Sequence, residues 1–226
     1  MSSEMTMRVW RGRAAAGGAP EPVRDLVEFS DGSGSARLVA YPERELPPGG
    51  VPAYLAARGS GARSFVLWAD EHRRERVATV VTASAAGGVA TFQVLGAHGE
   101  LIGTFVREKA LRGRGLRTRW TVQQAGGREA VGYKGRIVWW CVWWSLCPVQ
   151  ALFMLSALLG NGGDVARGPR RIIWRADGRT PLEFRSGGDR LLLHAPETDW
   201  RLAAALTVLL RAFDSWLGDP WDARKK

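Results

Sequence analysis

The feature that most constrains the fold is a stretch near the C-terminus that is apolar on every side. Residues 202–210 read Leu-Ala-Ala-Ala-Leu-Thr-Val-Leu-Leu, a composition that favours a helix. Because successive residues of an α-helix are rotated by about 100°, these residues leave no polar face. The charges of Arg201, Arg211 and Asp214 limit the uncharged stretch to nine residues, less than half of the roughly 20 that span a bilayer. We therefore expect the helix to be buried inside the protein.

The ends of this helix carry ordinary start and stop signals. Thr198 or Asp199 is suited to cap the first turn. Gly218 is suited to end the helix, and Pro220 prevents its continuation. A barrel is the arrangement in which one sheet can surround a helix. The side chains that we expect at the centre of such a barrel are Leu202, Leu206, Leu209, Leu210 and Phe213.

Short apolar segments separated by turn residues indicate an antiparallel sheet built from hairpins. The clearest is 90–95, which turns through Ala97-His98-Gly99-Glu100 into 101–107. We predict a mainly β fold, an antiparallel β-barrel wrapped around the buried C-terminal α-helix and carrying one apolar helical insert. The nine predicted strands are 64–69, 76–83, 90–95, 101–107, 118–124, 129–133, 171–175, 182–185 and 190–194.

The composition divides the chain into three parts. Residues 1–62 are rich in Ala, Gly, Pro and Ser, and we expect a loosely ordered leader with possible edge strands at 27–29 and 36–41. Residues 63–217 hold the predicted barrel, with an insert at 137–163, and 218–226 form a basic tail. The first 13 residues contain charges and no apolar core, so we expect no secretory signal peptide.

A hairpin-built sheet followed by a helix apolar on every side resembles the tubby C-terminal-like superfamily, which includes phospholipid scramblases and LURP-one-related proteins. The resemblance implies a barrel of about a dozen strands around a central helix, and it implies lipid or phosphoinositide binding, or lipid scrambling, as in some members. The chain departs from the pattern in showing fewer recognisable strands and no acidic calcium loop. The segments that look alike are Gln93–Arg107, Lys109–Arg117, Arg119–Val122 and Leu202–Trp216.

The insert contains an uncharged segment, 137–159, whose 23 residues would extend roughly 34 Å as a straight helix, enough to cross a bilayer. A single crossing would put the strands before and after it on opposite sides of the membrane. Pro148 disfavours a continuous helix, so the segment can instead dip into one leaflet and return. The alternative is packing against the barrel. The residues that we expect to contact the membrane are Trp139, Trp140, Trp143, Trp144, Leu152 and Phe153.

Basic residues outnumber acidic ones by 32 to 22, which favours an anionic partner. Arginine greatly exceeds lysine, a bias typical of the GC-rich coding of actinobacteria. The densest basic segment runs from residue 107 to 119, and its guanidinium groups are suited to phosphate. A solvated loop is the alternative interpretation. The residues that we expect to bind lipid headgroups are Arg107, Lys109, Arg112, Arg114, Arg117 and Arg119.

Catalytic and cofactor motifs are missing from the sequence. His72, His98 and His194 are far apart, and Cys141 and Cys147 cannot form a four-ligand zinc site by themselves. We recognise no nucleophile elbow, dinucleotide loop or phosphate-binding loop. No strand interleaves basic residues with aromatic ones, which argues against nucleic acid as a partner. We therefore expect no enzyme activity, no cofactor and no metal.

These observations lead to one functional expectation and two alternatives. We expect a non-enzymatic β-barrel protein that binds anionic membrane lipid, in the cytoplasm, peripheral or monotopic at the inner face of the membrane. One alternative is a soluble interaction module that uses the Trp-rich insert to bind a protein partner. The other is a single-pass membrane protein that spans at 137–159.

Overall fold

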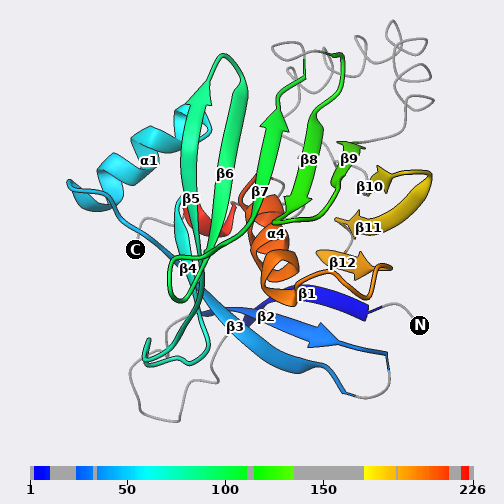
Figure 1. Cartoon of the computed structure of the whole chain (residues 1–226). Helices are drawn as coiled ribbons and strands as arrows, with labels where there is room; N and C mark the ends of the chain where they lie inside the picture. The colour runs from blue at the N-terminus through cyan, green and yellow to red at the C-terminus, as the bar shows by residue number, and fades with distance from the viewer. Residues whose placement is uncertain are drawn as a thin grey trace, which may run out of the picture.

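The computed structural model describes residues 3–10, 24–32, 35–110, 115–134, 171–186, 188–213 and 220–223. Within them, twelve strands form one closed antiparallel barrel around the helix α4 (Trp200–Phe213) (Figure 1). Each strand pairs with its neighbours in the sequence, and β1 pairs with β12 to close the barrel. The strands are β1 (Ser3–Trp10), β2 (Arg24–Ser30), β3 (Arg37–Arg44), β4 (Phe65–Trp68), β5 (Arg76–Ala86), β6 (Val89–Gly96), β7 (Leu101–Glu108), β8 (Arg119–Gln124), β9 (Glu129–Lys134), β10 (Arg171–Ala176), β11 (Arg179–Arg185) and β12 (Arg190–Leu193).

The nine strands predicted from the sequence are confirmed, with ends that shift by one to three residues. The other three strands come from residues 1–62, where we expected a leader with possible edge strands at 27–29 and 36–41. These two segments overlap β2 and β3, which are paired on both sides, whereas β1 was not predicted. The barrel therefore begins at β1 rather than at residue 63. In β1, Met5, Met7 and Val9 alternate with polar residues, which is the period-two pattern of a strand. Its pairing with β12 and β2, far away in the sequence, places it in the sheet.

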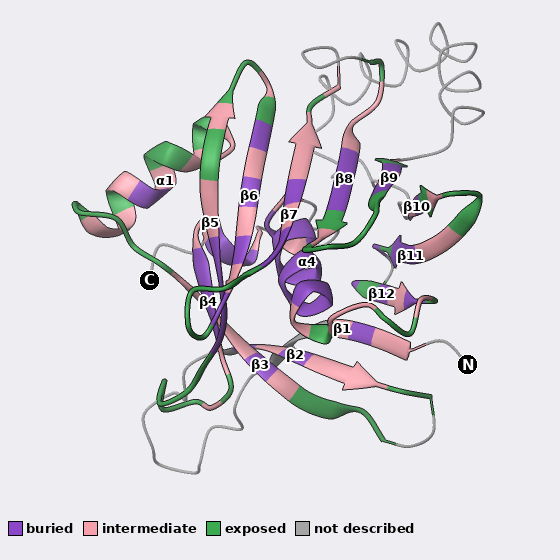
Figure 2. Ribbon diagram, in the orientation of Figure 1, coloured by how far each residue is buried: buried purple, intermediate pink, exposed green. Residues whose placement is uncertain are grey.

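Two further helical segments lie among the described residues. Helix α1 (Gly50–Ser60) connects β3 to β4, and the short 3₁₀ helix η1 (Trp221–Ala223) follows α4. Only Tyr54 of α1 is buried, so α1 covers the outside of the barrel with one narrow contact (Figure 2). Sequence analysis missed α1 because its apolar residues follow no clear helical period.

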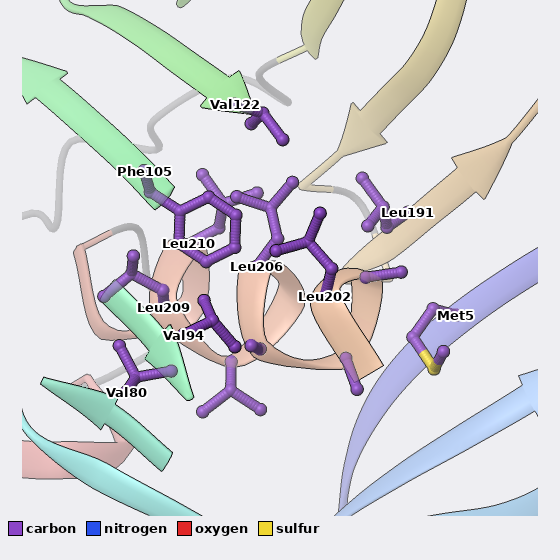
Figure 3. Close-up of a cluster of buried hydrophobic side chains, with 14 of the residues drawn as sticks. Met5, Val80, Val94, Phe105, Val122, Leu191, Leu202, Leu206, Leu209 and Leu210 are labelled. Carbon is purple, nitrogen blue, oxygen red and sulfur yellow. The ribbon is translucent and has the colours of Figure 1, made fainter. Parts of the chain in front are cut away.

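Helix α4 is buried from Leu202 to Leu210, as its composition predicts (Figure 2). Each residue from Leu202 to Leu210 exposes no more than 2% of its surface. The single polar member, Thr207, donates its hydroxyl proton to the carbonyl oxygen of Ala203 at 2.8 Å, so no polar atom of that side chain is left without a partner. Figure 3 shows the leucines of α4 among side chains from several strands, including Met5, Val80, Val94, Phe105, Val122 and Leu191.

Gly103 allows β7 to approach α4 closely. A Cβ atom at this position would lie 2.5 Å from the carbonyl oxygen of Gln123 and 2.8 Å from a methyl carbon of Leu202. Neither neighbour has room to withdraw, since one is backbone in the adjacent strand and the other is packed in the core. The small side chains of Ala203, Ala204 and Ala205 serve the same purpose on the helix, because the barrel interior must hold a whole helix at normal packing density.

We expect the Gly103→Ala substitution to destabilise the protein by about 1 to 3 kcal/mol, the usual cost of overpacking a core. The measurement is the free energy of unfolding in urea. The control is Gly59→Ala in α1, where a Cβ atom meets nothing within 4 Å and an alanine improves helix propensity. Equal stability of the Gly103→Ala variant and the native protein would contradict the close packing of β7 on α4.

Candidate functional site

The barrel interior offers no room for a ligand, because α4 occupies it. Two hollows in the described part of the molecule are open grooves. One of about 380 Å³ lies between α1 and the neighbouring strands, beside Tyr54, Arg63 and Thr82. Another, of about 620 Å³, lies at the start of α4 beside Gln124 and Trp200. Within the described ranges no three His, Cys, Asp or Glu side chains are placed to hold a metal ion.

The two ends of the barrel differ in their charge. We call them the Trp200 end and the Phe213 end, after the first and last residues of α4. Among the described residues, carboxylates outnumber cations at the Trp200 end, whereas cations outnumber carboxylates at the Phe213 end. The described cations at or near the Phe213 end are Arg44, Arg58, Arg63, Arg107, Lys109, Arg117, Arg119, Lys134, Arg171, Arg185, Arg190 and Arg211; the carboxylates there are Asp25, Glu45, Glu108, Glu183, Asp189 and Asp222.

Four of the predicted headgroup residues, Arg107, Lys109, Arg117 and Arg119, are described, and they lie at the Phe213 end in different surroundings. Arg107 points inward, with its guanidinium carbon 4.2 Å from the centre of the Phe213 ring. Arg119 points outward and forms ion pairs with Glu108 at 3.1 Å and Glu129 at 3.4 Å. Lys109 is exposed. Because Arg119 is partly neutralised and Arg107 lies inside the barrel opening, neither presents its charge as openly as Lys109 does.

Arg117 lies over the ring of Tyr133, with 4.8 Å between its guanidinium carbon and the ring centre. This stacking holds the end of the β7–β8 connection against β9. The backbone of the same connection is fixed as well, because the amide of Lys134 donates to the carbonyl oxygen of Thr118 at 3.0 Å. The remaining two predicted headgroup residues, Arg112 and Arg114, lie outside the described residues.

The predicted membrane-contact residues Trp139, Trp140, Trp143, Trp144, Leu152 and Phe153 also lie outside the described residues. The strands on either side of this segment are described, and they pair directly, with Lys134 opposite Ile172 and Tyr133 opposite Ile173. This pairing disfavours a single crossing at 137–159, which would separate the two strands. None of the helices in the described parts of the chain is long and apolar enough to span a membrane.

A buried ionic cluster closes the Phe213 end beside α1, and sequence analysis did not predict it. Its centre is the carboxylate of Asp222 in η1, which has no exposed surface. Arg58 donates two hydrogen bonds to this carboxylate, at 2.8 and 2.9 Å, and Tyr54 donates a third at 3.2 Å. The Nε atom of Arg63 lies 2.9 Å from the same carboxylate. Two cations thus compensate one buried anion, and they tie η1 to α1 and β4.

The electrostatics of the cluster follow from its burial. Burial lowers the pKa of Arg63 to about 10, against the opposing effect of Asp222, so this guanidinium stays charged at neutral pH. Burial, together with the negative charge of Asp222, raises the pKa of the Tyr54 hydroxyl, which therefore stays protonated and donates its hydrogen bond. Arg63 also donates to the carbonyl oxygens of Arg58 at 3.1 Å and Ala62 at 2.6 Å.

The aromatic ring of Phe213 packs against the guanidinium groups of Arg63 and Arg107. The guanidinium carbons of Arg63 and Arg107 lie 4.3 and 4.2 Å from the centre of the ring, within the range of favourable cation–π contact. The edge of the ring also contacts Phe92 and Trp120, at centre distances of 6.0 and 5.7 Å. Of the five residues predicted to lie at the centre of the barrel, Leu202, Leu206, Leu209 and Leu210 are fully buried. Phe213 is half-buried where the helix leaves the barrel.

No protein-family model, curated protein or solved structure matches this chain. Twelve strands around a central helix agree with the architecture that a resemblance to the tubby C-terminal-like superfamily implies. Membership of that superfamily stays a prediction. The functional interpretation is therefore based on the geometry of the Phe213 end.

We expect Asp222→Asn to destabilise the protein by about 3 kcal/mol, because the buried Arg63 and the half-buried Arg58 lose their counter-charge. The free energy of unfolding in urea at neutral pH measures the change. Asp177→Asn serves as the control, since that carboxylate pairs with Arg128 at the exposed Trp200 end and its loss should leave stability unchanged. If both variants unfold at the same urea concentration, the Asp222 cluster does not hold η1 in place.

Proposed function

We propose that this protein binds anionic membrane lipid through the Phe213 end of its barrel. This proposal rests on one observation, which is that two features of the sequence lie at the same end of the barrel. The basic connection that follows β7 and both flanks of the uncharged segment 137–159, Lys134 and Arg171, lie at this one end. Cations beside an apolar segment are what an anionic bilayer surface attracts and retains.

The charge on this end is suited to a surface rather than to a single small anion. The exposed Lys109 and the stacked Arg117 lie on one connection, while Lys134 ends β9. Each cation near an anionic leaflet contributes about 1 kcal/mol, and this contribution decreases with salt. The segment 137–159 would add apolar contact with the acyl chains, and the stable attachment of a protein generally needs two such signals.

The filled interior favours binding over chemistry. No described cavity encloses a ligand, and the buried charges near the barrel opening are engaged with one another around Asp222. A protein of this design can attach to a membrane, and its tubby-like resemblance makes lipid movement a further possibility to test. The competing interpretation, a soluble module that binds a protein partner through the Trp-rich insert, is an outcome of the experiments below.

The first test neutralises the cations at the Phe213 end. We expect the triple variant Lys109→Gln, Arg117→Gln and Lys134→Gln to bind vesicles containing phosphatidylglycerol on the order of a hundredfold more weakly, given about 1 kcal/mol per charge. Sedimentation of the protein with vesicles at two salt concentrations measures the effect. The variant should also show a weaker dependence on salt.

The matched control neutralises three exposed cations at the Trp200 end, Arg74, Arg175 and Arg179, and changes the net charge by the same amount. We expect this control to keep most of its binding. Equal losses in the two triples would show that net charge alone decides binding. A native protein that does not sediment with anionic vesicles at low salt would refute the proposal.

A second test removes residues 137–163. Because Lys134 pairs with Ile172, the residues that remain between the two strands are enough to connect them as a hairpin loop. We expect the shortened protein to stay folded and to bind anionic vesicles more weakly, with circular dichroism and vesicle sedimentation as the measurements. Unchanged vesicle binding would remove the insert from the membrane interface. Loss of the fold would show that the insert packs against the barrel.

A further inference from the structure

An exposed leucine lies in the basic connection between β7 and β8, shortly before β8 begins. Leu116 exposes 70% of its surface, more than any other large hydrophobic side chain in the described part of the chain. It lies next to Arg117 in the sequence. A single exposed leucine is common on protein surfaces, so its neighbours decide whether it has a role.

Leu116 and described residues of the β7–β8 connection and of the end of β9 provide both apolar and basic side chains at the Phe213 end. We define the Leu116 surface as Lys109, Leu116, Arg117, Tyr133 and Lys134. Tyr133 points outward from β9 and is 45% exposed. Arg117 stacks on its ring, and this stacking together with the hydrogen bond from Lys134 to Thr118 fixes the connection against the barrel. Leu116 therefore lies next to residues that are held against β9.

The side chains of the Leu116 surface are of the apolar, aromatic and cationic kinds that a bilayer interface accommodates. The leucine provides an apolar side chain, the tyrosine provides a ring with a polar hydroxyl, and the lysines and the arginine provide cations. Tyrosine is enriched where a protein meets the headgroup layer, and cations there contact lipid phosphates. A protein partner would need acidic groups around an apolar pocket, and nothing in the charge pattern requires that more specific arrangement.

We propose that Leu116 inserts into the outer acyl region of an anionic bilayer, while Arg117, Tyr133, Lys109 and Lys134 contact the headgroups. This inference rests on the proposed function, and it adds the residue that enters the membrane and the mode of entry. The cations would bring the Phe213 end to the surface. The leucine would then make the attachment depend on a bilayer rather than on phosphate alone.

The test compares Leu116→Ser with Leu101→Ser. Leu101 is a matched control, because it is also exposed, at 46%, and begins β7 at the Trp200 end. We expect Leu116→Ser to weaken binding to vesicles of phosphatidylcholine and phosphatidylglycerol about tenfold, since the transfer of a leucine side chain from water is lost. Leu101→Ser should bind as the native protein does. Thermal unfolding of both variants checks that the fold is kept.

A second measurement reports insertion directly. In a background with Cys141→Ser and Cys147→Ser, an environment-sensitive dye is attached at Leu116→Cys or at Leu101→Cys. We expect a blue shift of the dye emission at position 116 with anionic vesicles, no shift at position 101, and no shift at either position with inorganic phosphate. A shift with phosphate alone would show an ion site rather than insertion.

The outcomes separate this inference from the proposed function. If the native protein binds anionic vesicles and loses binding in the Lys109, Arg117 and Lys134 triple, but Leu116→Ser binds normally and the dye does not shift, then the leucine does not insert. If the native protein binds no vesicles, the proposed function itself fails. If the Leu116 surface instead captures a protein while vesicles leave the dye unchanged, this end is a protein interface.

Discussion

The structure depends on the burial of one helix that has no polar side. From Leu202 to Leu210, α4 presents apolar atoms in every direction, so a single sheet or a single layer of helices would leave part of it in water. A closed barrel removes all of that surface from solvent, and twelve strands provide a ring wide enough to do so. The alanines of α4 and Gly103 of β7 make the fit possible, because they reduce the width that the helix needs.

Because α4 fills the barrel, we look for binding sites on the outer surface and at the two ends of the barrel. The two ends of the barrel become distinct, because each connection of an up-and-down barrel returns to one end or the other. The Trp200 end carries short turns with more carboxylates than cations among the described residues, and the Phe213 end carries α1, η1 and an excess of cations. This asymmetry is the basis on which we propose an anionic lipid partner.

The cations of the Phe213 end have different tasks despite their similar chemistry. Arg58 and Arg63 compensate the buried Asp222 and hold η1 against α1. Arg107 stacks on Phe213 inside the opening, whereas Lys109 extends into solvent. A run of basic residues in a sequence is therefore a poor guide to a binding surface, because strand alternation sends neighbouring side chains to opposite faces of the sheet.

The buried helix and nine of the strands were predictable from the sequence, because all-round apolarity and regular turn signals are local properties that do not depend on the tertiary context. The sequence also located the basic segment and the uncharged segment. It did not determine the roles of Asp222, Arg63 and Tyr54, whose contacts join residues more than 150 positions apart. Only the closing of the barrel, through the pairing of β1 with β12, decided which charges are buried, which are stacked and which meet solvent. The environment of each charge depends on which distant segments become neighbours in the fold, and local sequence patterns do not contain that information.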